Sequence, residues 1–220
     1  YLKNNIFNEF LLPESLYITH AHIGHYTGLM YFGREALGSK NLLVKVLPKM
    51  SKFLKTNGPW SQLVAINNIQ IQDTNFGISN NELTNISVTP IQVPHRDEYS
   101  ETAGYVIQGK NKKALFIPDI DKWEKWDKNL IQLVEEFDYL LLDATFFDSK
   151  EINRDISEIP HPLVTETMNL LVNLSPETKN KVYFIHMNHT NLMLDPNSNL
   201  SKLVISKGYN IARLGQKLYL

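Results

Sequence analysis

Apolar positions along the chain change their spacing twice, and each change predicts a change in architecture. Near both ends, short continuous apolar runs alternate with stretches in which apolar residues recur at helical spacing, which is typical of buried strands and amphipathic helices. Between Gly58 and Gly109 the spacing is two, which predicts antiparallel strands. The predicted helices cover residues 1–12, 26–37, 48–56, 122–136, 162–174 and 198–207. The predicted strands lie at 16–19, 42–47, near 69–71, 86–88 and 91–93, at 104–108, 113–117, 139–142 and 182–185, and near 210–214 and 217–220.

This order of elements predicts an α/β fold in which two sheets have helices outside them. The length of 220 residues fits one domain, so we expect residues 1–220 to form a single one. A hydrophobic content of 43% is enough for a proper core.

The charge balance argues against two classes of partner. The net charge of −1 gives no basic field for nucleic acid or for a membrane surface. No apolar run approaches the length of a membrane span. We therefore expect a small-molecule substrate, and a homodimer remains open. The chain begins at Tyr1 rather than Met, so we expect an incomplete N-terminus and take the cytoplasm as the default compartment.

Three histidines follow the first predicted strand within a few residues. His20, His22 and His25 lie in the segment that begins at Thr19. The sequence has no Cys, so any metal must be held by His, Asp or Glu. Neutral imidazole is a ligand suited to zinc and iron. Because side chains alternate on a strand, the three rings converge only if the strand stops and the chain turns around an ion. A His-rich surface loop is the alternative.

Three further candidate ligands each close an apolar run. His95, Asp119 and His186 stand where predicted strands end, which is where α/β folds place their sites. Any one of them alone is more often structural, but together with the first histidines they indicate a metal centre. Asp143 also ends a predicted strand, and His161 precedes the helix predicted from Pro162. A residue fixed at a helix start is the alternative for His161.

The order of these motifs resembles the metallo-β-lactamase fold superfamily: HxHxxH, a strand-end His, a strand-end Asp and a strand-end His. Within that superfamily, residues 17–29, 141–147 and 184–191 look most like the PqqB-like branch. Residues 141–147 are also similar to RNase Z and to phosphonate-pathway cyclic phosphodiesterases. The resemblance implies an αββα sandwich, from which this chain is expected to lack part of the first N-terminal sheet.

The resemblance also implies the metal ligands. His20, His22 and His95 would hold a first metal, and Asp119 would bridge or complete that site. His25 and His186 would face a second metal. The implied cofactor is zinc, as one or two ions, with manganese or iron as alternatives.

Gly24 departs from the pattern of the superfamily, which usually has Asp at this position. Occupancy of the second site is therefore open. His189, Asp97 or a water molecule are candidate replacements for the missing ligand.

The hypothesis that follows is a metal-dependent hydrolase of a small ester, lactone or phosphodiester. Asp119 would help to hold the metal and the attacking water. By resemblance, the pair Asp143 and His161 would transfer a proton, and His161 would give it to the leaving group. Two alternatives remain: a PqqB-like iron-dependent oxidative enzyme in cofactor biosynthesis, and a non-enzymatic metal-binding domain.

Overall fold

The structure is a computed structural model that describes residues 12–82, 85–152, 155 and 158–220. The helix predicted over residues 1–12 therefore lies, apart from Leu12, outside the described residues. The chain divides into two compact units, each with its own sheet. The first unit comprises residues 1–78 and 97–103, and the second comprises residues 79–96 and 104–220.

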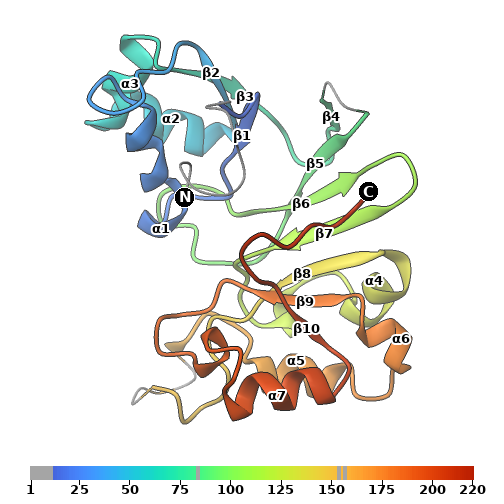
Figure 1. Ribbon diagram of the computed structural model, residues 1–220. Helices are drawn as coiled ribbons and strands as arrows, with labels where there is room; N and C mark the ends of the chain where they lie inside the picture. The colour runs from blue at the N-terminus through green and yellow to red at the C-terminus, as the bar shows by residue number, and fades with distance from the viewer. Residues whose placement is uncertain (1–11, 83–84, 153–154, 156–157) are drawn as a thin grey trace. The chain divides into compact units, whose positions relative to one another are not determined.

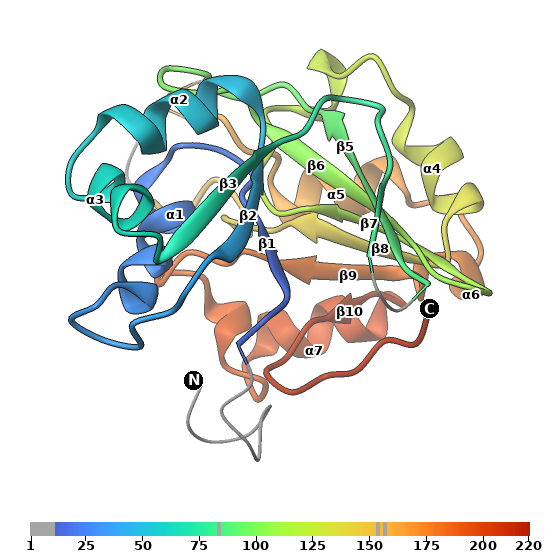
Figure 2. The same cartoon turned by 90° about the horizontal axis from the view of Figure 1, so that it is seen from above.

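The first unit is built on a three-stranded parallel sheet in the order β1-β2-β3 (Figure 2). Its strands are β1 (Ser15–Tyr17), β2 (Leu42–Val46) and β3 (Ile69–Asp73). Two helices, α2 (Pro48–Thr56) and α3 (Trp60–Ala65), connect β2 to β3. Pro48 stands at the first turn of α2, where its missing N–H costs nothing. Buried side chains of the strands and of α2 form one apolar core in this unit, including Val44, Val46, Met50 and Leu54.

Three expectations for the first unit were wrong. β3 pairs with β2 in parallel, because helices α2 and α3 return the chain to the same end of the sheet. Helix α3 lies in a stretch expected to hold only strands. The helix expected over residues 26–37 is instead a short α1 (Ile23–Tyr26) followed by a 3₁₀ helix (Thr27–Phe32). Gly33 ends that segment with an extended backbone, and glycine is a weak helix former.

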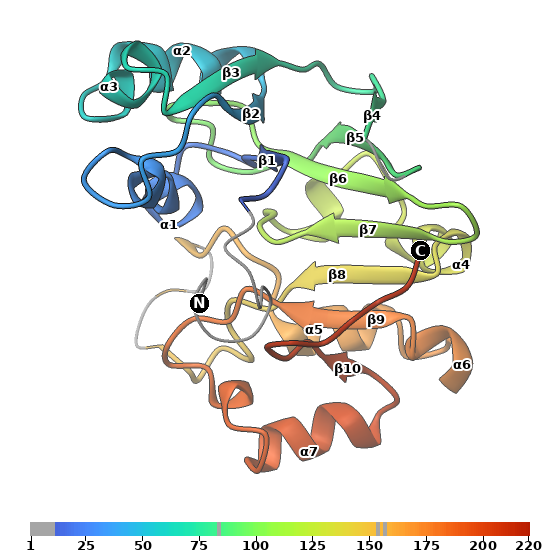
Figure 3. The same ribbon diagram turned by 45° about the horizontal axis from the view of Figure 1, so that its top comes forward.

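The second unit contains a seven-stranded mixed sheet in the order β10-β9-β8-β7-β6-β5-β4 (Figures 1 and 3). The hairpin of β6 and β7 is antiparallel, whereas β7, β8, β9 and β10 run parallel to one another. The strands are β4 (Asn80–Asn81), β5 (Ser87–Gln92), β6 (Ala103–Gln108), β7 (Lys113–Ile117), β8 (Tyr139–Asp143), β9 (Val182–Ile185) and β10 (Asn210–Ile211).

The helices of the second unit pack buried apolar side chains against this sheet. Leu130 and Val134 of α4, Val164 of α5 and Val204 of α7 belong to one core with buried residues of β7, β8 and β9. The helices are η2 (Trp123–Lys125), α4 (Leu130–Glu136), α5 (Val164–Leu170), α6 (Pro176–Lys179), η4 (Leu192–Leu194) and α7 (Asn199–Ser206).

The helix expected over residues 122–136 is interrupted. Trp126 has an extended backbone, and its indole N–H donates to the carbonyl of Gln92 at 2.9 Å. Helix α4 then begins afresh, because the side chain of Asn129 accepts from the N–H of Ile131 at 2.9 Å. A tertiary contact therefore overrides the helical spacing. The strand expected near 210–214 is shorter than predicted, and residues 217–220 form no strand.

The expected α/β class is confirmed. Because β7, β8 and β9 are parallel neighbours, their carboxyl ends lie at one edge of the sheet, and this edge carries the candidate site of the second unit. Within the described part of the chain, no helix has both the length and the apolar character needed to span a membrane.

Candidate metal centre

The histidine loop of the first unit follows β1 and is held by backbone contacts. The carbonyl of Thr19 accepts from the N–H of Ala103 at 3.0 Å, and the N–H of Ala21 donates to the Ser100 hydroxyl at 2.8 Å. Since these bonds fix the chain on both sides of His20, that side chain is only 1% exposed. The fold of the first unit therefore fixes the conformation of the loop around His20.

His20 and His22 direct ring nitrogens at one another. His20 Nε2 lies 2.9 Å from His22 Nδ1, and the rings meet edge to face. His22 Nε2 lies 2.9 Å from Glu98 Oε2, so a neutral His22 donates this N–H to the carboxylate and keeps a lone pair on Nδ1. A carboxylate that orients a histidine in this way is common at metal sites. The two facing nitrogens suit a cation.

His25 belongs to the same group of rings. Its ring centroid lies 4.1 Å from that of His20, and its Nδ1 lies 3.3 Å from the hydroxyl of Thr19. Gly24 stands in α1 beside it, and a Cβ added there would meet no atom within 4 Å. The position therefore has room for a side chain.

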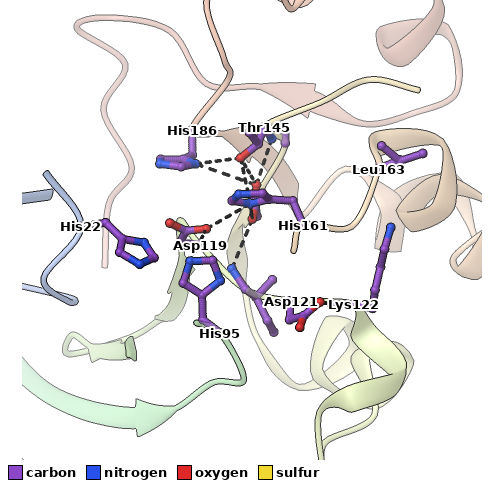
Figure 4. Close-up of polar contacts among 12 residues, drawn as sticks. His22, His95, Asp119, Asp121, Lys122, Thr145, His161, Leu163 and His186 are labelled. Atoms are coloured by element: carbon purple, nitrogen blue, oxygen red, sulfur yellow. Dashed lines mark hydrogen bonds and ion pairs between the residues drawn. The ribbon is translucent and has the colours of Figure 1, made fainter. Parts of the chain in front are cut away.

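In the second unit, Asp119 and His186 each follow a strand end, and Asp143 is the last residue of its own strand. Asp119 comes after β7, Asp143 ends β8 and His186 comes directly after β9. The adjacent, parallel ends of these strands bring the three side chains to one edge. His95, which follows β5, places Nε2 3.4 Å from Asp119 Oδ1. Figure 4 shows the side chains of His95, Asp119 and His186 converging with that of His161.

Asp143 is fully buried, and donors fill both of its oxygens. Oδ1 accepts from the backbone N–H and the hydroxyl of Thr145, at 2.9 and 2.7 Å. Oδ2 accepts from the N–H of Ile120 at 3.2 Å and lies 2.8 Å from His161 Nδ1. Burial alone would raise the pKa of Asp143, but the hydrogen bond from His161 and the nearby ring of His186 outweigh it and hold the pKa below its usual value. The carboxylate is ionised and accepts only.

His161 lies between two carboxylates. Its Nδ1 is 2.8 Å from Asp143 Oδ2 and 3.0 Å from Asp119 Oδ1, and Figure 4 shows His161 beside Asp119. Burial lowers the pKa of His161, but hydrogen bonds to Asp119 and Asp143 outweigh burial and raise the pKa from 6.5 to about 10. His161 is therefore an imidazolium at neutral pH while no cation competes for Asp119. The predicted pair Asp143 and His161 is brought into direct contact.

The donor set of the second unit fits a metal ion. A ligand atom of Asp119 and one of His186 lie within 4.8 Å of each other, and so do those of Asp119 and His95. Ligand atoms of Asp119, Asp143 and His161 also lie within 4.8 Å of one another. Imidazole and carboxylate donors suit zinc, manganese and iron. Of the two carboxylates, Asp119 suits an ion better, because donors already fill Asp143.

Two residues of the site carried no role in the sequence prediction. Glu98 orients His22, and Thr145 contacts Asp143, His161 and His186. The position of Thr145, two residues after a strand-end Asp, was the available signal; nothing local marked Glu98.

The candidate replacements for the ligand missing at Gly24 have hydrogen-bond contacts of their own. The Thr102 hydroxyl donates to Asp97 Oδ1 at 2.8 Å. His189 is exposed, and its Nδ1 lies 3.1 Å from Asn188 Oδ1.

The fold and the site together define an α/β protein with a cluster of histidines and carboxylates at strand ends. The family model of the beta-lactamase superfamily domain matches residues 14–187. The chain therefore belongs to this superfamily and has the metallo-β-lactamase fold, as the motifs predicted.

Solved structures resemble this chain over most of its length. Zn²⁺-bound PqqB from Methylobacterium extorquens matches with a TM-score of 0.76 at 18% identity, covering 94% of this chain and 73% of that one. A diphosphatase from the PhnP family matches with a TM-score of 0.62 at 20% identity, covering 94% and 71%. YhfI from Bacillus subtilis, a metallo-beta-lactamase fold protein, matches with a TM-score of 0.62 at 14% identity, covering 91% and 74%. A comparison with curated protein sequences finds no match.

Proposed function

We propose that this chain is a metal-dependent hydrolase that cleaves a small ester, lactone or phosphodiester. One observation supports the proposal: His161 contacts Asp143 and Asp119 and lies beside the rings of His95 and His186, so the proposed proton donor lies next to candidate metal ligands. Structures similar to this chain include a diphosphatase of the PhnP family, which supports phosphorus esters as the first substrates to test.

The proposed ligands are those that the sequence resemblance implies. They are His20, His22 and His25 of the first unit and His95, Asp119 and His186 of the second. Zinc is the first metal to test, since the similar PqqB structure is Zn²⁺-bound. When bound, such an ion would act as a Lewis acid that polarises a carbonyl or phosphoryl oxygen, and it would lower the pKa of a metal-bound water molecule to about 7.

His161 is the proposed general acid. Its Nδ1 is hydrogen-bonded to Asp143 and faces Asp119, so Nε2–H is the proton that it has to give. Loss of a leaving alkoxide needs such a proton, and a histidine oriented by a carboxylate can supply it. Asp143 holds His161 in place; because its own oxygens are filled, it does not itself receive the substrate's proton.

The proposal is tested by metal analysis of the purified protein together with assays on three substrate types. These are bis-p-nitrophenyl phosphate, a p-nitrophenyl ester and a simple lactone. We expect bound metal and turnover of at least one substrate, with turnover lost in Asp119→Asn. Protein that takes up no zinc, manganese or iron, or that binds metal without turning over any of the three, would contradict the proposal. Bound iron with oxygen uptake would instead favour the oxidative alternative.

A further inference from the structure

Thr145 connects three ionisable side chains of the second unit. Its hydroxyl oxygen lies 2.7 Å from Asp143 Oδ1, 2.9 Å from His186 Nδ1 and 3.2 Å from His161 Nδ1. Figure 4 shows Thr145 beside His186 and His161. Thr145 is a buried residue. A hydroxyl has one proton to donate, so its contacts cannot all have the same direction.

The direction of each bond follows from Asp143. As an ionised carboxylate, Asp143 can only accept, so the Thr145 hydroxyl donates its hydrogen bond to Oδ1. The oxygen of Thr145 can then only accept from His186, which must donate from Nδ1. A neutral His186 is thereby the tautomer with a proton on Nδ1 and a lone pair on Nε2.

The backbone holds this arrangement from both sides. The carbonyl of Thr145 accepts from the N–H of Asn188 at 3.0 Å, and the amide of Asn191 donates to the carbonyl of Ala144 at 2.9 Å. His186 itself has φ of 59°, a left-handed conformation that residues other than glycine rarely adopt. The loops after β8 and β9 are thus bound to each other where the two side chains meet.

We propose that Thr145 is a positioning residue that links Asp143 to His186 and fixes neutral His186 as the Nδ1–H tautomer, which carries its lone pair on Nε2. A carboxylate commonly orients a metal-binding histidine directly. In this chain Asp143 Oδ1 lies 3.9 Å from His186 Nδ1, too far for a direct hydrogen bond, and the hydroxyl spans the gap. The tautomer stands on the hydrogen bonds alone; only the use of Nε2 by a metal rests on the proposed function.

The first test needs no metal and no activity. Long-range ¹H–¹⁵N spectra of chelator-treated, ¹⁵N-histidine-labelled protein at alkaline pH report which nitrogen of neutral His186 carries the proton, with His186→Gln to assign the signal. We expect the Nδ1–H tautomer in the wild type and in Thr145→Ser, and a mixture of tautomers in Thr145→Val. A wild-type His186 protonated on Nε2, or a tautomer unchanged in Thr145→Val, would overturn the inference. Since the wild type alone can decide, a poorly folding variant does not leave the question open.

The second test measures zinc affinity by competition with a chromophoric chelator. Thr145→Val should bind zinc about 10–100-fold more weakly, as expected when a group that orients a ligand is lost, and Thr145→Ser should restore most of the affinity. Thr178→Val in α6 removes the same hydroxyl outside the cluster and should leave the affinity unchanged. Equal affinities in all four proteins would overturn the role of Thr145. Protein that shows the expected tautomer and binds no zinc would contradict the proposed function while leaving the link from Asp143 through Thr145 to His186 intact.

Discussion

His161 Nδ1 lies 2.8 Å from Asp143 Oδ2, and three other donors occupy the remaining positions around that carboxylate. A buried carboxylate with four donors is ionised and rigidly held, so it can fix the orientation of a histidine without reacting itself. Under the proposed function, this relationship makes Asp143 the residue that would position the ring and His161 the residue that would donate the proton.

Replacing Asp143 by Asn should destabilise the second unit. The amide can accept on one side only, so its NH₂ group would face donors that now have no acceptor, and such a loss costs about 1–3 kcal/mol. We expect this decrease in the free energy of unfolding from urea titrations with an unchanged m-value. Asp127→Asn, at an exposed position, is the matched control and should change stability by less than about 0.5 kcal/mol. Equal stability of the two variants would contradict the buried network.

The stability of the metal-free protein should depend on pH in a specific direction. The pKa of His161 is raised from 6.5 to about 10, so its contribution is complete below pH 6.5 and is lost as the pH rises through about 10. The pKa of Asp143 is lowered, so its contribution is present above pH 3.8 and is lost as the pH falls through the folded-state pKa.

Chelator-treated wild type and His161→Gln test this dependence by urea unfolding between neutral pH and about pH 10. The difference in unfolding free energy between them should shrink as the pH rises, because the wild type loses its charged pair and the variant has none. A difference that stays constant over this range would show that His161 is not held as an imidazolium.

The proton donated by His161 should matter most when the leaving group is basic. We expect His161→Gln to lower kcat about 10²–10⁴-fold on a phosphodiester or ester with an alkyl leaving group. The same variant should lose much less on p-nitrophenyl substrates, whose leaving group departs without protonation. The two substrate types are controls for each other in one variant, because a damaged site would slow both. Equal losses would argue against general acid catalysis.

The sequence predicts the fold where local signals are strong. Continuous apolar runs located β2, β8 and β9, Pro48 marked the start of α2, and the hairpin of β6 and β7 was found around its turn. The predictions that were wrong concern features that depend on contacts between residues far apart in the chain. The break at Trp126 is made by a bond to Gln92, and the parallel pairing of β3 depends on a connection that no local pattern shows.

The residues of the candidate site also fall into those that a local sequence pattern marked and those that it did not. His95, Asp119, Asp143 and His186 were recognisable because polar residues stand out at the ends of apolar strands. Thr145 and Glu98 were not, because their roles come from partners 41 and 76 residues away in the chain. The only local signal for Thr145 was its position two residues after the strand-end Asp143, and Glu98 had none, because a threonine or a surface glutamate has no unusual chemistry of its own.

Gly24 should limit how many metal ions the protein binds. The superfamily usually has Asp at this place, and a Cβ at Gly24 meets nothing within 4 Å, so Gly24→Asp should fold normally. We expect the wild type to bind one equivalent of zinc and Gly24→Asp to bind two, by metal analysis after dialysis. Gly28→Asp adds the same charge at a position with equally open space and should remain at one equivalent. Two equivalents in the wild type would show that another residue supplies the missing ligand.

The most direct test of the proposed hydrolase is a zinc titration of chelator-treated protein in which bound zinc and hydrolysis of bis-p-nitrophenyl phosphate are followed together. The ligand set of histidines and Asp119 predicts that hydrolysis is absent without metal, rises in proportion to bound zinc and reaches its plateau when the site is filled. Zinc that binds without any rise in hydrolysis, there and with the ester and the lactone, would contradict the account, and so would hydrolysis that persists unchanged after the metal is removed.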